Sequence, residues 1–360
     1  MAQFIGFLTI VALISTYVAT FFVKKIAIHY NLVDDPAIRK HPAHIHKGII
    51  PRAGGLALFI GILVPIVFFL PVDKTIIGIM LGALITVVMG LIDDWKDVNP
   101  YIRFIGNIAS AVCVVGAGIG ISFISNPFGG VIHLDSYVLL PDLFAILFIV
   151  WTMNVVGWSS GVDGQLPGFV AIACFVLGIL SLRFVSEDIS QWVVTALAFI
   201  TMGSFLGFLP WNFYPQKIMP GYGGKTLAGF MLATLSILSG AKVGTMFLVL
   251  GLPMTDALFT IIRRLGKGKS PVWADRGHLH HRLLDYGWSI RKIAVFYWAI
   301  TALLGIIALN VSSQNKVFIL LTLVAVVGGI MLWLNKAQTE FTQSSEHTQR
   351  KPNPQSRQKV

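Results

Sequence analysis

The sequence predicts an all-α protein, a polytopic membrane helix bundle of about 10–11 transmembrane helices with its candidate active-site loops in the cytoplasm. Hydrophobic residues make up 55% of the 360 residues and charged residues only 12%, whereas a soluble domain carries about 25% charged residues. The mean hydropathy is +0.77. The two cysteines, Cys113 and Cys174, fall inside apolar runs and are therefore expected to be packing residues rather than a disulfide or metal ligands.

Eleven apolar runs approach the length of about 20 residues that crosses a bilayer. The first is followed by Lys24 and Lys25 and lacks a small-residue cleavage site, so we expect a retained anchor rather than a signal peptide. The division near Gly240 and Lys242 is the least marked. The predicted spans are 3–23, 53–71, 75–92, 102–122, 138–156, 166–184, 191–209, 225–241, 243–262, 293–311 and 316–334.

Basic residues are divided unequally between the two sides of this predicted bundle. With eleven spans, all but four of the 27 Lys and Arg fall on one side, and the exceptions are Lys74, Arg183, Lys242 and Lys316. Cytoplasmic loops of membrane proteins carry such an excess. We therefore place this side in the cytoplasm with the C-terminus, and we attribute the net charge of +11 to topology rather than to nucleic-acid binding.

Two segments outside the spans have a composition that predicts their structure. Residues 123–137 contain Asn-Pro and Gly-Gly pairs and predict an external turn or short hairpin. Residues 1–335 form the predicted integral membrane domain. Residues 336–360 are rich in Gln, Ser, Thr, Lys and Arg, which predicts a disordered cytoplasmic tail.

Three carboxylates close the third predicted span. Asp93, Asp94 and Asp97 follow the apolar run that ends at Ile92. If this end is helical, Asp93 and Asp97 share a face. A solvated helix end would explain one such acid, but three neighbouring carboxylates are usually held together by a cation.

Other polar motifs fall on the same predicted side. Basic residues of the first loop offer hydrogen-bond donors to phosphate oxygens, although positive-inside anchoring would also explain them. Two glycines flank Asp163 near the in-span amide of Asn154, and a glycine-rich turn precedes Lys225 at a helix start. A histidine cluster with Arg282 suits a phosphorylated anion better than zinc, because no Cys accompanies it. The first-loop and cluster residues are Arg39, Lys40, His41, Arg52, His278, His280, His281 and Arg282.

Taken together, these motifs resemble the polyprenyl-phosphate N-acetylhexosamine-1-phosphate transferases, glycosyl transferase family 4, over about residues 30–290. The histidine pattern resembles the N-acetylglucosamine-1-phosphate branch more than the muramoyl-pentapeptide branch. The matching residues are Val33-Asp34, Pro36, Arg39-Lys40-His41, Pro51-Arg52-Ala53-Gly54-Gly55, Asp93-Asp94-Trp95-Lys96-Asp97, Gly161-Val162-Asp163-Gly164, Phe208-Leu209-Pro210-Trp211-Asn212-Phe213, Asp256 and His278-Leu279-His280-His281-Arg282-Leu283-Leu284.

The resemblance implies a phosphotransferase of the plasma membrane. Such an enzyme transfers HexNAc-1-phosphate, here most readily GlcNAc-1-phosphate, from a UDP-sugar to undecaprenyl phosphate and releases UMP. The reaction initiates cell-envelope polysaccharides such as lipopolysaccharide. The implied partners are UDP-HexNAc, undecaprenyl phosphate and the lipid bilayer. A homodimer is compatible with this set, and nucleic acid is not expected.

The resemblance also implies roles for the residues of the polar motifs. Catalysis is assigned to Asp93, Asp94 and Asp97, and a magnesium ion (Mg²⁺) to Asp93, Asp94 and Asp163. The implied substrate-binding residues are Arg39, Lys40, His41, Arg52, Asn154, Asp163, Lys225, His278, His280, His281 and Arg282.

Two departures from the family pattern bear on these roles. In the stretch that begins at Asn154, the family's second Asn and first Asp positions are Gly157 and Ser160. In its Gly-Asp-x-Gly-Ser loop, the position of the metal-ligating Asp is Tyr222, which offers no carboxylate, and Lys225 ends the loop. Magnesium binding would have to rely on the remaining acids, or Lys225 could supply a fixed positive charge instead.

These departures leave alternatives open. Within the same class, the chain could be a phospho-MurNAc-pentapeptide transferase. A protein that lost catalysis could instead bind the lipid carrier as a scaffold. An ion transporter is the least favoured alternative, because its acids would lie at mid-depth in the membrane rather than at one edge.

Overall fold

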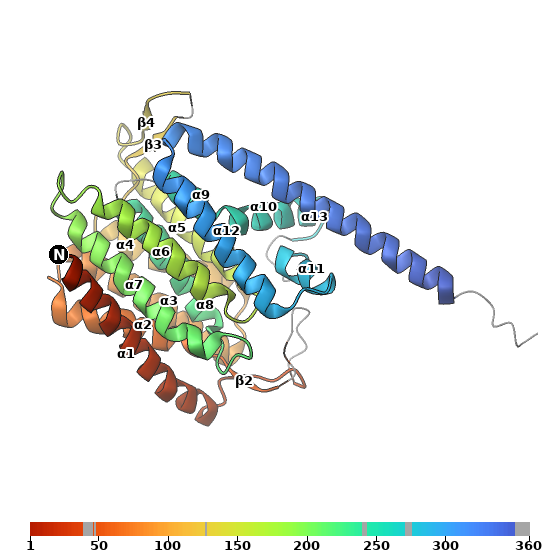
Figure 1. The fold of residues 1–360 in the computed structure, drawn as a ribbon. Coiled ribbons are helices and arrows are strands. Elements are labelled where there is room, and N and C mark those ends of the chain that lie inside the picture. The colour runs from red at the N-terminus through yellow and green to blue at the C-terminus, as the bar shows by residue number, and fades with distance from the viewer. Residues whose placement is uncertain (39–45, 47, 127, 240–242, 271–275, 350–360) are drawn as a thin grey trace, which may run out of the picture.

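The protein is a bundle of helices joined by short connections (Figure 1). The computed structural model describes residues 1–38, 46, 48–126, 128–239, 243–270 and 276–349. The helices are α1 (Ala2–His29), α2 (Gly54–Phe69), α3 (Lys74–Lys96), α4 (Pro100–Gly116), α5 (Leu140–Trp158), α6 (Gln165–Leu182), α7 (Gln191–Asn212), α8 (Gly221–Leu238), α9 (Val243–Val249), α10 (Gly251–Leu265), α11 (Leu279–Asp285), α12 (Ile290–Asn310) and α13 (Ser313–Gln349). This architecture confirms the predicted all-α membrane bundle.

Two antiparallel hairpins interrupt the helical chain. Strands β1 (Val33–Asp34) and β2 (Ile50–Pro51) pair between α1 and α2. Strands β3 (Phe123–Ser125) and β4 (Val131–His133) pair between α4 and α5. The second pair confirms that 123–137 forms a hairpin.

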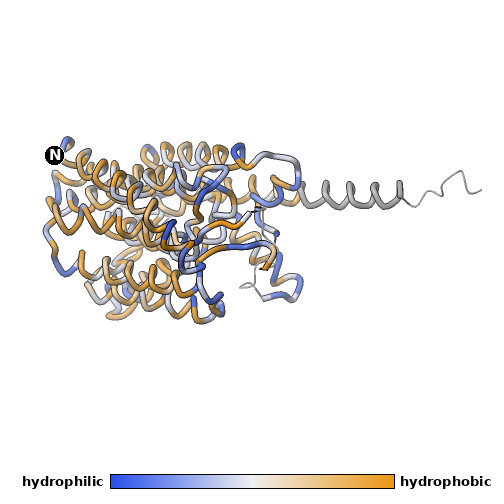
Figure 2. The backbone as a smooth tube through the Cα atoms, turned by 90° about the horizontal axis from the view of Figure 1, so that it is seen from below, coloured by the Kyte–Doolittle hydropathy of each residue, from blue (hydrophilic) through white to orange (hydrophobic). Residues whose placement is uncertain are grey.

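Helices occupy all eleven predicted spans, but they differ in their capacity to cross a membrane. Within the described residues, seven helices are long and apolar enough to cross a membrane, or up to eight if α9 and α10 count as one span bent by 81°. Helices α2 and α4 are apolar but shorter. Figure 2 shows hydrophobic colours along the helices and hydrophilic segments gathered mainly at their ends. The predicted span 243–262 is thus a broken helix pair, divided near Leu250 and Gly251.

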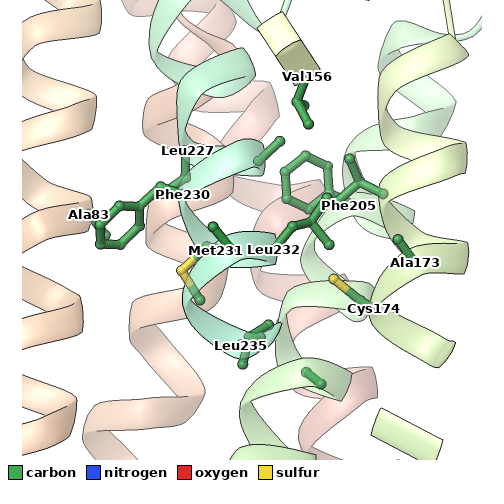
Figure 3. Close-up of a cluster of buried hydrophobic side chains, with 14 of the residues drawn as sticks. Ala83, Val156, Ala173, Cys174, Phe205, Leu227, Phe230, Met231, Leu232 and Leu235 are labelled. Carbon is green, nitrogen blue, oxygen red and sulfur yellow. The ribbon is translucent and has the colours of Figure 1, made fainter. Parts of the chain in front are cut away.

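Helix α8 lies at the centre of the core. Every residue from Thr226 to Ser236 is buried. Figure 3 shows Phe230 beside Ala83 of α3, while Phe205 of α7 gathers with Leu232 on another side of α8. Its small residues explain how a helix can be enclosed on all sides, because they let neighbouring backbones approach closely.

The predicted packing role of the cysteines is confirmed. Cys174 of α6 is fully buried in the same core, Cys113 of α4 is half-buried, and both are free thiols. Neither therefore forms a disulfide.

Glycines fix the first turn of α8 between α2 and α3. A Cβ added to Gly90 of α3 would lie 2.1 Å from Gly223 Cα, and one added to Gly55 of α2 would lie 2.4 Å from Gly224 N. The backbone N–H of Gly55 donates to Pro220 O at 2.9 Å. The three helix ends therefore touch through their backbones, and the residues around them are brought to one end of the bundle.

The C-terminal helix extends further than the sequence predicts. Disorder was expected from residue 336, but α13 continues to Gln349, and residues 350–360 lie outside the described part of the chain. Good helix formers, Ala337, Gln338 and Glu340, follow the apolar run and allow the helix to continue.

The close backbone contact at Gly90 gives a direct test of this packing. Gly90→Ala should lower the free energy of unfolding by about 1–3 kcal/mol, because the added Cβ must push α8 away. Gly6→Ala in α1 is the matched control, since nothing lies within 4 Å of the added Cβ and alanine favours a helix. Thermal unfolding in detergent measures both, and equal transition temperatures would contradict the packing.

Candidate active site

Two buried aspartates at the end of α3 form the centre of the polar region. Asp93 is 1% exposed and Asp94 is 4% exposed. Asp94 Oδ1 accepts a hydrogen bond from the backbone N–H of Tyr222 at 3.0 Å, so the start of α8 is seated on this carboxylate. Burying two carboxylates without positive partners would be very costly, so cations are expected close to them.

Arg52, between β2 and α2, faces the acid pair. Its Nη2 lies 3.2 Å from Asp94 Oδ1 and 3.9 Å from Asp93 Oδ2, and its Nη1 lies 4.0 Å from Asp34 Oδ1. His46 Nε2 lies 3.2 Å from the other oxygen of Asp34. The predicted binding residue Arg52 is therefore shared among three carboxylates.

Arg103 of α4 is a second cation at the pair and is not among the predicted site residues. It forms an ion pair with Asp93 Oδ1 through Nε, and Nη2 lies 3.0 Å from Asp97 Oδ1. Asp97 has a left-handed backbone with φ 52° after the helix ends, and its side chain is 60% exposed. The expected face of three acids is therefore a buried pair, with Asp97 outside it. The brief turn between α3 and α4 was the available signal for Arg103.

Tyr222 occupies the first turn of α8 beside Arg103. The Arg103 guanidinium lies 5.2 Å from the centre of the Tyr222 ring, within the range of a cation–π contact. The phenol oxygen donates to Asn107 Oδ1 at 3.3 Å. Tyr222 thus lies against the guanidinium that pairs with Asp93, and Asn107 fixes the ring.

Asp163 belongs to a second polar group, between α5 and α6. It is buried, and its Oδ2 accepts from the backbone N–H of Gln216 at 3.1 Å. Burial raises the pKa of Asp163, and the hydrogen bond from Gln216 opposes this increase. The neighbouring Gly164 N–H donates to Asn212 Oδ1 at 3.1 Å. Asp163 therefore joins the loop before α6 to the loop before α8.

The predicted amide at Asn154 has a local partner. Its Nδ2 donates to Val150 O of the same helix at 2.7 Å. One turn later, a Cβ added to Gly157 would lie 4.0 Å from Lys225 Cβ. The end of α5 therefore reaches Lys225 through Gly157.

Histidines of the segment around α11 form a third group. His278 Nδ1 lies 2.9 Å from Oδ2 of the fully buried Asp256, and Asp256 Oδ1 accepts from the backbone N–H of Leu279 at 2.8 Å. His280 lies directly against Gly161, where an added Cβ would overlap its ring. His278 is thus held by Asp256, and His280 contacts the Asp163 loop.

Burial keeps His280 and His281 neutral. It holds the pKa of His280 well below the usual range, assisted by His281 and His278. It also lowers the pKa of His281 to about 4. These two rings can donate or accept hydrogen bonds at neutral pH, but they carry no charge to a phosphate.

Arg282, a predicted binding residue, makes contacts that join three segments of the chain. Its Nε donates to Gly277 O at 2.9 Å and its Nη1 to Met331 O of α13 at 2.9 Å. Its guanidinium lies 5.8 Å from the centre of the Phe259 ring. These contacts tie α11 to α10 and α13. The other predicted basic residues, Arg39, Lys40 and His41, lie outside the described residues.

Lys225 is close enough to the acid pair and to the histidines for its charge to act on both. It lies one turn into α8, half-buried, within electrostatic range of Arg52, Asp94 and His280. Its amine makes no hydrogen bond or ion pair with a residue that the structure describes. Lys225 is therefore a cation available to an anionic ligand.

The side chains do not fit the magnesium ion that the resemblance implies. Among the described residues, no group of three or more His, Cys, Asp or Glu is placed to hold a metal. Asp93 and Asp94 lie together, but the structure does not add Asp163 to form such a group. The acid pair is instead matched by Arg52 and Arg103.

The lowered pKa of His281 predicts a loss of stability in acid. Burial, Arg276 and His278 lower this pKa from 6.5 to about 4, against the opposing effect of Asp285 and Asp256. Between pH 6.5 and about pH 4, the His281 ring is protonated in the unfolded state but stays neutral in the folded state. The free energy of unfolding should therefore fall as pH falls, by up to about 1.4 kcal/mol per pH unit for this group.

Thermal unfolding of wild type and His281→Gln across this pH range measures the effect. The variant should show a smaller decrease of transition temperature with acidification. The same decrease in both proteins would mean that other groups cause it.

Known proteins are similar to this chain over most of its length. The glycosyl transferase family 4 model matches residues 76–240. A probable undecaprenyl-phosphate N-acetylglucosaminyl 1-phosphate transferase of Bacillus subtilis is 30% identical over 347 residues, which cover 92% of this chain and 94% of the relative. A decaprenyl-phosphate N-acetylglucosaminephosphotransferase of Mycolicibacterium smegmatis is 30% identical, with 84% and 80% covered. An undecaprenyl-phosphate alpha-N-acetylglucosaminyl 1-phosphate transferase of Escherichia coli K12 is 29% identical, with 79% and 78% covered. The chain therefore belongs to glycosyl transferase family 4.

Proposed function

We propose that this protein transfers GlcNAc-1-phosphate from UDP-GlcNAc to undecaprenyl phosphate, releases UMP and so begins assembly of a cell-envelope polysaccharide. The observation that carries the proposal is the buried Asp93–Asp94 pair, held at the end of a membrane helix by two arginines. Relatives whose names include this transfer cover nearly the whole chain. Neither the MurNAc-pentapeptide branch nor the scaffold alternative has such support.

The reaction is a displacement at phosphorus. An oxygen of the lipid phosphate attacks the β-phosphorus of the donor, a new P–O bond forms, and the bond to the bridging oxygen breaks as UMP leaves. Positioning and charge neutralisation supply most of the rate in such transfers. The protein must therefore hold two anions close together and keep their charges balanced.

Asp93 has the geometry to accept a proton from the lipid phosphate. Its Oδ1 is occupied by the Arg103 ion pair and the Val98 N–H at 3.1 Å. Its buried Oδ2 has no hydrogen-bond donor among the described residues. The Oδ1 of Asp94 receives the Tyr222 N–H and Arg52, which ties this carboxylate to the start of α8. We therefore assign proton acceptance to Asp93 and the positioning of α8 to Asp94.

A transfer assay tests this assignment. Radiolabelled UDP-GlcNAc and undecaprenyl phosphate should yield a labelled lipid and UMP, and Asp93→Asn should reduce the rate about 100-fold or more, as loss of a general base does. The control is Asp135→Asn in the exposed turn after β4, which should not change the rate. Asp97→Asn should have a smaller effect than Asp93→Asn, since Asp97 is 60% exposed.

Testing a panel of UDP-sugar donors in the same assay distinguishes this function from the MurNAc-pentapeptide and scaffold alternatives. Turnover of UDP-MurNAc-pentapeptide but not UDP-GlcNAc would assign the chain to the other branch. No turnover of any UDP-sugar by folded protein would favour the lipid-carrier scaffold.

We further propose that the acid pair faces the cytoplasm of the plasma membrane. The basic residues concentrated on its side support this orientation. In a background with Cys113→Ser and Cys174→Ala, a cysteine at Gly268 should resist an impermeant thiol reagent in intact cells, while one at Lys74 should react. Labelling at Gly268 from outside would reverse the orientation.

A further inference from the structure

Each member of the acid pair already has an arginine partner. Asp93 pairs with Arg103, and Asp94 pairs with Arg52 at 3.2 Å. Arg52 also reaches Asp34, and Arg103 also reaches Asp97. Arginine remains charged at any physiological pH, so these ion pairs persist across that range.

A divalent cation at this pair would meet unfavourable neighbours. Magnesium requires near-octahedral oxygen coordination at about 2.0–2.1 Å. The buried oxygen that lacks a donor, Asp93 Oδ2, lies 3.9 Å from Arg52 Nη2. An ion bound to this oxygen would lie beside a positive charge, and the described residues add no third acid to form a metal-holding group.

Tyr222 favours the arginine arrangement over a metal. Its ring lies under the Arg103 guanidinium at 5.2 Å, and its hydroxyl is held by Asn107. A phenol held in this way occupies the first turn of α8 without offering a carboxylate. The same turn therefore stabilises the cation that pairs with Asp93.

Lys225 lies one turn further along α8, where a phosphate would complete its environment. It is within electrostatic range of Asp94 and of His280, and Gly157 places no side chain against it. Its amine makes no hydrogen bond or ion pair with a described residue, and a partly buried cation without a direct partner is costly. An anionic ligand would relieve this cost through charge-assisted hydrogen bonds.

We propose that Lys225 binds the pyrophosphate of the UDP-sugar donor and that, with Arg52 and Arg103 paired to the buried acids, transfer proceeds without a divalent cation. The inference rests on the proposed function for its substrate. It concerns a metal-independent diphosphate site, which binding can test separately from turnover.

The experiment uses the full-length protein in lipid nanodiscs after treatment with EDTA. Binding of UDP-GlcNAc and of inorganic pyrophosphate is measured by calorimetry, and transfer is measured in EDTA and in excess MgCl₂. Wild type should bind both ligands in EDTA and transfer at the same rate in both conditions. Lys225→Gln should weaken binding about tenfold or more, as expected for a lost charge-assisted contact.

Two variants guard against indirect effects. Lys225→Arg should retain most of the affinity because it keeps the charge. Lys217→Gln is the matched control, since Lys217 lies over the Trp211 ring in the loop before α8. This variant should bind both ligands with the affinity of wild type. The wild-type comparison in EDTA remains decisive even if Lys225→Gln does not fold.

The outcomes separate this inference from the proposed function. Transfer and binding that vanish in EDTA and return with MgCl₂ would overturn the inference and leave the function standing. Equal binding by Lys225→Gln and wild type would also overturn it. Pyrophosphate binding in EDTA that depends on Lys225, without any transfer, would support the site and reject the function.

Discussion

The arrangement of the site depends on the contact of three helix backbones at Gly55, Gly90 and the Gly223-Gly224 pair. Side chains at these positions would hold α2, α3 and α8 apart. With glycine, the first turn of α8 comes close enough for Tyr222 N–H to reach Asp94. The close contact of these helix backbones encloses both carboxylates. Because buried carboxylates are costly without positive partners, the same contact makes the arginines necessary.

Composition and apolar runs were sufficient to predict the bundle, the hairpin at 123–137 and the packing role of the cysteines, since these depend on local pattern. The apolar runs predicted less about the path of each helix through the membrane. The 81° bend between α9 and α10 lies inside a continuous apolar run, and hydropathy does not register a change of direction. Beyond residue 335 a helix forms where disorder was predicted, because a polar composition of this kind is compatible with both.

For the site, the sequence located the acid pair, Arg52, Asp163 and Lys225, which stand out as polar groups beside apolar spans. It could not assign partners. Arg282 stands out among histidines, but the sequence does not reveal that its Nε and Nη1 donate to the backbone carbonyls of Gly277 and Met331. Arg103 was not among the predicted site residues, yet it pairs with Asp93. The partners of both arginines are set by tertiary contacts, which the neighbouring residues in the sequence do not reveal.

The shared arginines also constrain how this protein can diverge. Arg52 contacts acids from both the first hairpin and α3, so its loss would leave several carboxylates unbalanced at once. A neutral substitution at Arg52, Asp94 or Arg103 should therefore be tolerated only when a compensating change accompanies it. Within its lineage, these positions form an epistatic unit, in which one substitution alters which substitutions are accepted at the others.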